Sequence, residues 1–184
     1  MGMGKTAIVL LAEGFEEVEA VTPIDYLRRA GIGVTVAAVG EGLAVMGARG
    51  VLITADAELK SLSGPWDAVV VPGGMPGAPN IAASKEACAL IAQMAAAGKL
   101  VCAICASPAI ALAPLGLLAG RKFACYPGME ERVPEGKWVD APVAVDGNIV
   151  TSQGAGTSAL FSLEIIAQLL GKAEADKVAK AALL

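Results

Sequence analysis

Continuous apolar runs alternate along this chain with longer stretches in which apolar positions recur at helical spacing. Residues 68–72 and 100–104 carry no charged side chain, as expected for strands of a parallel sheet that is covered on both faces. The predicted strands cover residues 5–12, 32–39, 68–72 and 100–104. Hairpins are predicted at residues 43–55, on a sheet edge, and at residues 143–151, with Asp146 and Gly147 in the turn.

Helices are predicted between these strands. They cover residues 84–97, part of 107–118, 157–170 and 174–183. Residues 16–21 are expected to form a short helical turn. A separate helix is expected to begin at Thr22 and Pro23, because proline suits the first helical position, and to end at Gly31.

Alternation of strands and helices predicts an α/β fold, a three-layer sandwich whose mostly parallel central sheet has helices on both faces. We expect residues 1–184 to form a single domain, since the length suits one domain. Ligands of such folds bind at the carboxyl ends of the strands, so functional residues are expected in the loops that follow them.

Composition removes several classes of function. The net charge is −4 and no basic stripe is present, which argues against a nucleic-acid partner. The chain contains no histidine. This absence excludes catalysis by Ser-His-Asp or Cys-His groups and removes the commonest metal ligand.

An uncharged stretch between Lys99 and Arg121 is long enough to cross a bilayer. Pro108, Pro114 and Gly116 interrupt it, so we interpret it as a buried strand followed by a buried helix and expect no membrane association. The apolar run near the N-terminus is too short for a signal peptide, which predicts a cytoplasmic protein.

Cys102 and Cys105 have the spacing of a redox motif. In an extended strand, however, such residues lie about 10 Å apart and point to opposite faces, which is too far for a disulfide. A zinc site is also disfavoured, because no second close cysteine pair is present. We therefore predict no metal and no redox pair.

Cys105 lies where a predicted strand turns into a predicted helix. Such a corner exposes a nucleophile, and a helix start with its free N–H groups lowers the pKa of a thiol. Packing as a small apolar side chain is the alternative for Cys105 and the preferred reading for Cys88 and Cys102.

Two other strand ends are expected to meet Cys105. Gly73 and Gly74 follow one strand and can present N–H groups to a developing oxyanion. The first strand is followed by three carboxylates, Glu16, Glu17 and Glu19. One of them, buried against a thiolate, would have a raised pKa and would stay protonated.

Four motifs together give a specific resemblance, in order and over nearly the whole chain. They are AEGFEEVE at 12–19, VPGG at 71–74, AICA at 103–106 and TSQGAGTS at 151–158. With these motifs the chain resembles the ThiJ/PfpI superfamily, and within it the branch of DJ-1, the Parkinsonism-associated protein.

This resemblance implies a flavodoxin-like fold, a homodimer, a reactive Cys105 and a protonated Glu19. It further implies that Gly73, Gly74 and Ala106 supply backbone N–H donors. The nearby arginines that it implies are Arg29 and Arg49. The arginines correspond to residues near an anion site at the dimer edge of the family.

Two positions depart from the family pattern. The peptidase branch has histidine where this chain has Ala106, which argues against proteolysis. Tyr126 stands where the human member of the family has a histidine near the cysteine, and its hydroxyl could position substrate but not act as a base near neutral pH.

The resulting hypothesis is a cofactor-free cysteine enzyme that acts on small reactive dicarbonyls or on glycated substrates. Cys105 would attack the aldehyde of methylglyoxal, and Glu19 would shuttle a proton to give lactate. The alternative is a non-catalytic oxidation sensor or holding chaperone in which Cys105 becomes a sulfinate.

Overall fold

A computed structural model describes residues 4–184, so residues 1–3 of the expected domain lie outside the described part. Within residues 4–184, the strands form a seven-stranded sheet in the order β10-β11-β7-β6-β1-β2-β5. The bounds of these strands are β1 (Thr6–Ala12), β2 (Gly33–Val39), β5 (Ala57–Glu58), β6 (Ala68–Val71), β7 (Leu100–Ile104), β10 (Val143–Asp146) and β11 (Ile149–Ser152). Neighbouring strands run parallel, and the edge pair β10 and β11 is antiparallel.

Smaller pairs of strands lie outside this sheet. They are β3 (Ala44–Met46) with β4 (Leu52–Thr54), and β8 (Lys122–Phe123) with β9 (Lys137–Trp138). The first pair is the predicted hairpin.

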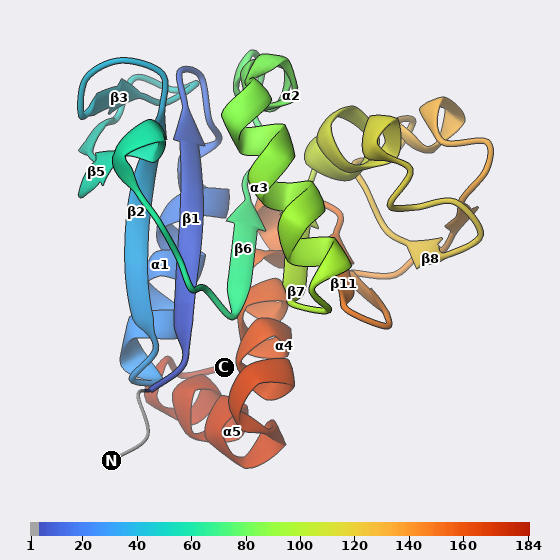
Figure 1. The fold of residues 1–184 in the computed structure, drawn as a ribbon. Coiled ribbons are helices and arrows are strands. Elements are labelled where there is room, and N and C mark those ends of the chain that lie inside the picture. Colours follow the sequence, from blue (N-terminus) through green and yellow to red (C-terminus); the bar gives the residue numbers. More distant parts are fainter. Residues whose placement is uncertain (1–3) are drawn as a thin grey trace.

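The helices are α1 (Glu17–Arg29), α2 (Gly77–Ala83), α3 (Lys85–Ala96), α4 (Ser158–Leu170) and α5 (Lys172–Ala181). Short helical turns are η1 (Leu59–Ser61), η2 (Pro108–Leu112), η3 (Ala113–Leu115), η4 (Glu130–Arg132) and η5 (Ala155–Thr157). Figure 1 shows α2 and α3 on one side of the sheet, with α1 on the opposite side.

Alternating side chains of the central strands form the two layers of the core. Val9 and Leu11 of β1 pack in one cluster with residues of α1, α4 and α5. Ile8 and Leu10 of the same strand pack in the other cluster with residues of α2, α3 and η2. Each central strand is apolar on both faces because helices cover both faces of the sheet. The predicted α/β sandwich is therefore confirmed.

The first helix differs from its prediction. A single helix, α1, covers both the expected turn and the expected second helix, and Pro23 lies inside it. Proline removes one N–H from the helix, and the residue that loses this partner is Glu19, one turn earlier. The early start of α1 matters because it places Glu19 in the first turn, beside the carboxyl ends of the strands.

The segment after β7 is only partly helical, as predicted. It forms a single π-helical turn, η2, followed by the tight turn η3, and Gly116 ends it in a left-handed conformation with a φ of +73°. The sequence did not predict α2, which lies directly after the Gly73–Gly74 loop.

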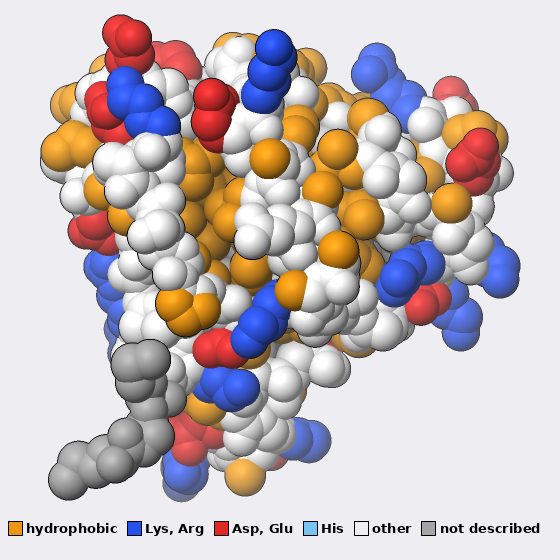
Figure 2. All heavy atoms as spheres, viewed as in Figure 1, with side chains coloured by type: hydrophobic (Ala, Val, Ile, Leu, Met, Phe, Trp, Pro, Cys, Tyr) orange, Lys and Arg blue, Asp and Glu red, His pale blue; other side chains and the backbone are white. Residues whose placement is uncertain are grey.

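In the view of Figure 1, apolar side chains gather beside α3, as Figure 2 shows. Leu59, Leu62, Trp66 and Leu90 line a pocket of about 400 Å³. Over residues 4–184, no helix is both long enough and apolar enough to span a membrane.

Candidate active site

Cys105 occupies a sharp corner at the carboxyl end of β7. Its φ of +64° lies in the left-handed region, which is costly for a residue with a side chain. Two backbone hydrogen bonds hold it there: the Cys105 N–H donates to the carbonyl oxygen of Ser152 at 3.0 Å, and its own carbonyl oxygen accepts from the N–H of Tyr126 at 2.8 Å. This geometry is the strained corner that the sequence predicted.

A buried serine ties this corner to the neighbouring strand end. The Ser107 hydroxyl donates a hydrogen bond of 2.6 Å to the carbonyl oxygen of Pro72, which directly precedes Gly73. Because β6 and β7 are adjacent in the sheet, the Gly73–Gly74 loop lies beside Cys105.

Glycine is required at both positions of this loop. A Cβ at Gly73 would lie 2.7 Å from the Cβ of Cys105 and 2.7 Å from Oε2 of Glu19, which is too close for either contact. Gly74 has a φ of +93° and packs against the backbone of residues 14–16. The backbone N–H groups of Gly74 and Ala106 act on the Cys105 sulfur and lower the pKa of its thiol.

Glu19 faces Cys105 across Gly73. Its side chain is 1% exposed, and its Oε2 accepts a hydrogen bond of 2.9 Å from the N–H of Gly73. Burial raises the pKa of Glu19 from its usual range to about 7, against the opposing effects of the Gly73 and Cys105 hydrogen bonds. A nearby carboxylate, Glu16, raises it further.

The thiol responds to the same surroundings. Burial, followed by the charge and hydrogen bonding of Glu19, raises the pKa of Cys105 to about 12, while the N–H groups of Ala106 and Gly74 act to lower it. The lowered pKa expected from the sequence is therefore wrong. Burial of the sulfur is the largest cause, and the negative charge of Glu19 adds to it because it opposes a second negative charge on sulfur.

The two side chains consequently titrate as one unit. When Glu19 holds a proton, the contribution of its charge to the Cys105 pKa disappears, while the effects of burial and of the N–H groups remain. A thiolate at Cys105 thus depends on a proton at Glu19, and the pair holds a single proton between its two ionisation steps.

A pocket of about 520 Å³ opens onto this pair. Its polar lining residues are Glu16, Glu19, Arg49, Cys105, Tyr126 and Arg132. The rest of the lining is apolar or small and consists of Ala48, Gly74, Met75, Ala106, Ile110, Met129 and Ala155. The pocket lies at the carboxyl ends of β1, β6 and β7, where the α/β sheet was expected to bind a ligand.

Of the three remaining predicted residues, the structure places two at the pocket and one away from it. Tyr126 lines the pocket with a side chain that is 54% exposed. Arg49 also lines the pocket, and its backbone N–H donates a hydrogen bond of 2.6 Å to Oε1 of Glu17. Arg29 does not line the pocket: it lies at the other end of α1 from Glu19 and is ion-paired with Asp25 on the surface.

Several lining residues were not predicted. Met75, Ile110, Met129 and Arg132 come from loops and short turns whose sequence shows no periodic pattern. Position was an available signal for Met75 and Ile110, which follow strand ends that the motifs had already marked, but not for Met129 and Arg132, which follow β8. Cys102, by contrast, is fully buried, and burial raises its pKa well above the usual range, in keeping with a packing role.

Within residues 4–184, no group of three or more Cys, Asp or Glu side chains is arranged to hold a metal ion. The pocket presents a thiol, a buried carboxyl group and nearby backbone N–H groups.

Comparison with known proteins gives a consistent result. The model of the DJ-1/PfpI family matches residues 5–168. The chain is 40% identical over 180 residues to the Parkinson disease protein 7 homolog of Danio rerio, with 95% of each chain covered. It is 39% identical over 178 residues to Protein DJ-1 homolog B of Arabidopsis thaliana, with 96% of this chain but only 41% of that protein covered.

A relative from Caenorhabditis elegans, named glutathione-independent glyoxalase DJR-1.2, is 32% identical over 184 residues, with 98% of this chain and 97% of that protein covered. Among solved structures, that of oxidized Toxoplasma gondii DJ-1 superimposes with a TM-score of 0.95 at 39% identity, with 98% of both chains covered.

Proposed function

Because this chain belongs to the DJ-1/PfpI family, we propose that it is a cofactor-independent cysteine enzyme that converts reactive dicarbonyls to hydroxy acids. The observation that carries this proposal is the burial of the Glu19 carboxyl group between Gly73 and the Cys105 thiol. A base with a pKa of about 7 can both take and return a proton at neutral pH. The relative named as a glyoxalase supports the choice of reaction.

The first step is addition of the thiol to an aldehyde. The Cys105 sulfur forms a bond to the aldehyde carbon of methylglyoxal, while its proton passes to Glu19 and then to the aldehyde oxygen. The product is a hemithioacetal. The N–H groups of Gly74 and Ala106 stabilise the negative charge as it moves from sulfur toward that oxygen.

The second step moves a proton between adjacent carbons. Glu19 removes the proton from the carbon bonded to sulfur, which gives an enediol, and returns a proton to the neighbouring carbon. The resulting thioester of lactate is hydrolysed by water, which releases lactate and restores the thiol. Methylglyoxal and one water molecule thus give lactate, with no external oxidant or reductant.

Release of carbonyl adducts from amines or thiols begins with the same attack by Cys105. Such deglycase activity is included in the proposal, since the pocket of about 520 Å³ has room for a larger adduct. In that reaction the amine or thiol would leave before the same thioester is formed.

Lactate formation from methylglyoxal by the purified protein tests the proposal. The wild type and a Cys88→Ser control are expected to produce lactate, while Cys105→Ser is expected to produce none. Cys88 is the matched control, since it is also a partly exposed free cysteine but lies on α3, outside the pocket. Lactate formation by Cys105→Ser at the wild-type rate would overturn the proposal.

Sensing of oxidants is a second candidate function. It is favoured by the partial exposure of Cys105 and by the existence of an oxidized structure of the Toxoplasma relative. Addition of two oxygens from peroxide would give a sulfinate, next to the N–H groups of Gly74 and Ala106. Selective oxidation of Cys105 in intact-mass measurements, together with no turnover of methylglyoxal, would favour this function.

We also propose a homodimer in the cytoplasm, where the Cys105 thiol would stay reduced. The exposed apolar side chains Val21 and Val51 come from α1 and from the hairpin that Glu17 ties to it. Val51→Glu is expected to give a monomer in light scattering, whereas Leu160→Glu, at an equally exposed site on α4, is expected to leave the dimer intact. Identical masses for both variants would argue against this interface.

A further inference from the structure

The pocket is much larger than methylglyoxal requires. Its volume of about 520 Å³ falls within the range of roughly 300–1,000 Å³ that drug-sized ligands occupy. A three-carbon dicarbonyl at Cys105 would leave most of this space to water. The shape and charge of the rest of the pocket lining therefore indicate which longer substrate would fit.

Charge is unevenly distributed around the pocket. Glu16 and Glu19 come from the beginning of α1, and the charge of Glu19 acts on Cys105. Arg49 also lines the pocket, and its charge acts on Glu17, which lowers the pKa of that carboxyl group. Arg132 comes from η4, which packs against η2. A negatively charged group would be repelled at the sulfur end and attracted toward Arg132.

Part of the pocket lining, next to η2 and η4, is apolar. The η2 turn begins just after Cys105, and Ile110 on this turn lines the pocket, as does Met129 at the start of η4. A short aliphatic segment fits such a lining because it loses no hydrogen bonds there.

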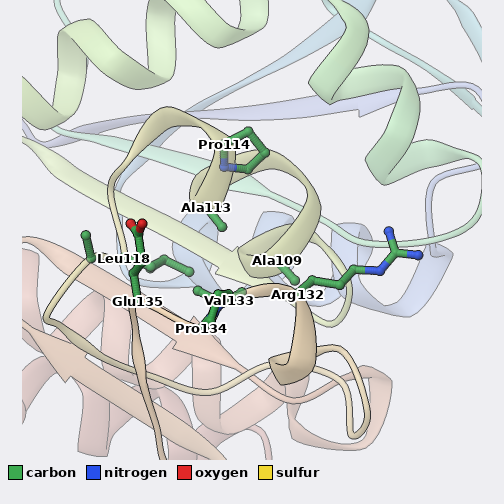
Figure 3. A pocket seen from close by; sticks show the side chains of 9 residues that line it. Ala109, Ala113, Pro114, Leu118, Arg132, Val133, Pro134 and Glu135 are labelled. Atoms are coloured by element: carbon green, nitrogen blue, oxygen red, sulfur yellow. The ribbon is translucent and has the colours of Figure 1, made fainter.

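Arg132 is available to bind a ligand. Across residues 4–184 its guanidinium group forms no ion pair, unlike Arg28 and Arg29, which do. Arg132 also borders a second pocket, of about 280 Å³, with Pro134 and Glu135. Figure 3 shows its side chain extending past Ala109 and away from Glu135, so that carboxylate does not neutralise it.

From these observations we infer that Arg132 selects substrates, and that the preferred substrate of the proposed reaction is a 2-oxoaldehyde whose far end carries a carboxylate. The uncharged dicarbonyl end would lie at Cys105, the aliphatic middle against Ile110, and the carboxylate at Arg132. Because Glu16 also lines the pocket, a singly charged carboxylate fits better than a doubly charged phosphate. This inference rests on the proposed function for its reactive end only.

The kinetic test compares 4,5-dioxopentanoate with its uncharged methyl ester. The wild type is expected to have a higher kcat/KM for the acid. In Arg132→Met this preference should fall by about fivefold, mainly through KM, since a single solvent-accessible ion pair contributes up to about 1 kcal/mol. Arg132→Lys should retain part of the preference, and Arg29→Met, which removes the same charge outside the pocket, should retain all of it.

Binding of an unreactive analogue separates this inference from the proposed reaction. Levulinate has the same carbon chain and carboxylate but no aldehyde, and its affinity is measured by NMR titration in the Cys105→Ser background. Arg132→Met is expected to weaken levulinate binding about fivefold relative to methyl levulinate. This result without turnover of either dioxo compound would reject the reaction and keep the carboxylate site.

Two outcomes would overturn the inference whatever the turnover. One is equal binding of levulinate with and without Arg132, or no binding at all. The other is an acid-over-ester preference that is the same in Arg132→Met as in the wild type.

Discussion

The N–H of Gly73 donates a hydrogen bond of 2.9 Å to Oε2 of Glu19, and this bond holds the carboxyl group next to the Cys105 thiol. The bond joins the end of β6 to the first turn of α1, so it forms only in the folded protein. The bond engages Oε2, one of the two carboxyl oxygens of Glu19. The rest of the carboxyl group stays available to exchange a proton with sulfur or with a substrate bound to sulfur.

Glu19→Gln should remove the proton acceptor while preserving the size of the side chain. We expect kcat for lactate formation to fall by about 10²–10⁴-fold, the usual contribution of general acid–base catalysis. Glu131→Gln, on the exposed surface of η4 and outside the pocket lining, should retain wild-type activity. A Glu19→Gln protein with unchanged kcat would remove Glu19 from the mechanism.

Gly73→Ala should separate the pair by steric contact. The added Cβ would lie 2.7 Å from both Cys105 and Glu19, so one of them must move. Overpacking of this kind costs about 1–3 kcal/mol of stability, and we expect activity to fall at least about tenfold. The matched control is Gly156→Ala, where a Cβ meets nothing within 4 Å. Equal activity of the two variants, with equal melting temperatures, would contradict this geometry.

Stability should depend on pH through Glu19. Its pKa is raised from 4.5 to about 7 in the folded protein, so the folded state holds a proton that the unfolded state has lost between these values. The stabilisation is complete below pH 4.5 and is lost as the pH rises through about 7. The shift corresponds to about 3 kcal/mol.

Urea unfolding at pH 4.5 and pH 8 measures this effect. Glu19→Gln cannot lose the proton. From pH 4.5 to pH 8, its free energy of unfolding should therefore increase by about 3 kcal/mol relative to that of the wild type. Titrating groups that do not interact with Glu19 cancel, because they are common to both proteins. A difference between the proteins that stays constant with pH would show that Glu19 titrates normally.

Two buried serines should respond differently to replacement by alanine. Ser107→Ala removes the hydrogen bond of 2.6 Å to Pro72 and should cost about 1–3 kcal/mol, since the Pro72 carbonyl loses this buried donor. The Ser158 hydroxyl is equally buried but finds no partner within residues 4–184, so Ser158→Ala should be neutral or stabilising. Equal losses in thermal unfolding would contradict these hydrogen-bond assignments.

Much of the fold could be predicted from periodicity, because the central strands are apolar on both faces and glycine or proline marks their ends. β7 was predicted residue for residue. The start of α1 was not, since Pro23 favours a helix start, and only the packing of α1 beside the strand ends extends the helix back to Glu17. Tertiary contacts overrode a local preference there.

The candidate site was predicted in part for a similar reason. Glycines and a cysteine at strand ends identify which loops meet, so Cys105, Gly73 and Gly74 could be named. The raised pKa of the Cys105 thiol could not be predicted, because it depends on how deeply the sulfur is buried and how close Glu19 lies. Arg132 escaped prediction since nothing in its local sequence distinguishes it from other surface arginines.

The central claim is that Cys105 and Glu19 share a proton, and ¹³C NMR titration of the Glu19 carboxyl carbon and the Cys105 Cβ tests it most directly. We expect the Glu19 carbon to titrate near pH 7 and the Cys105 carbon to respond in the same step. In Glu19→Gln that step should vanish from the Cys105 carbon. A Glu19 carbon that titrates near 4.5, with no change at Cys105, would contradict the account.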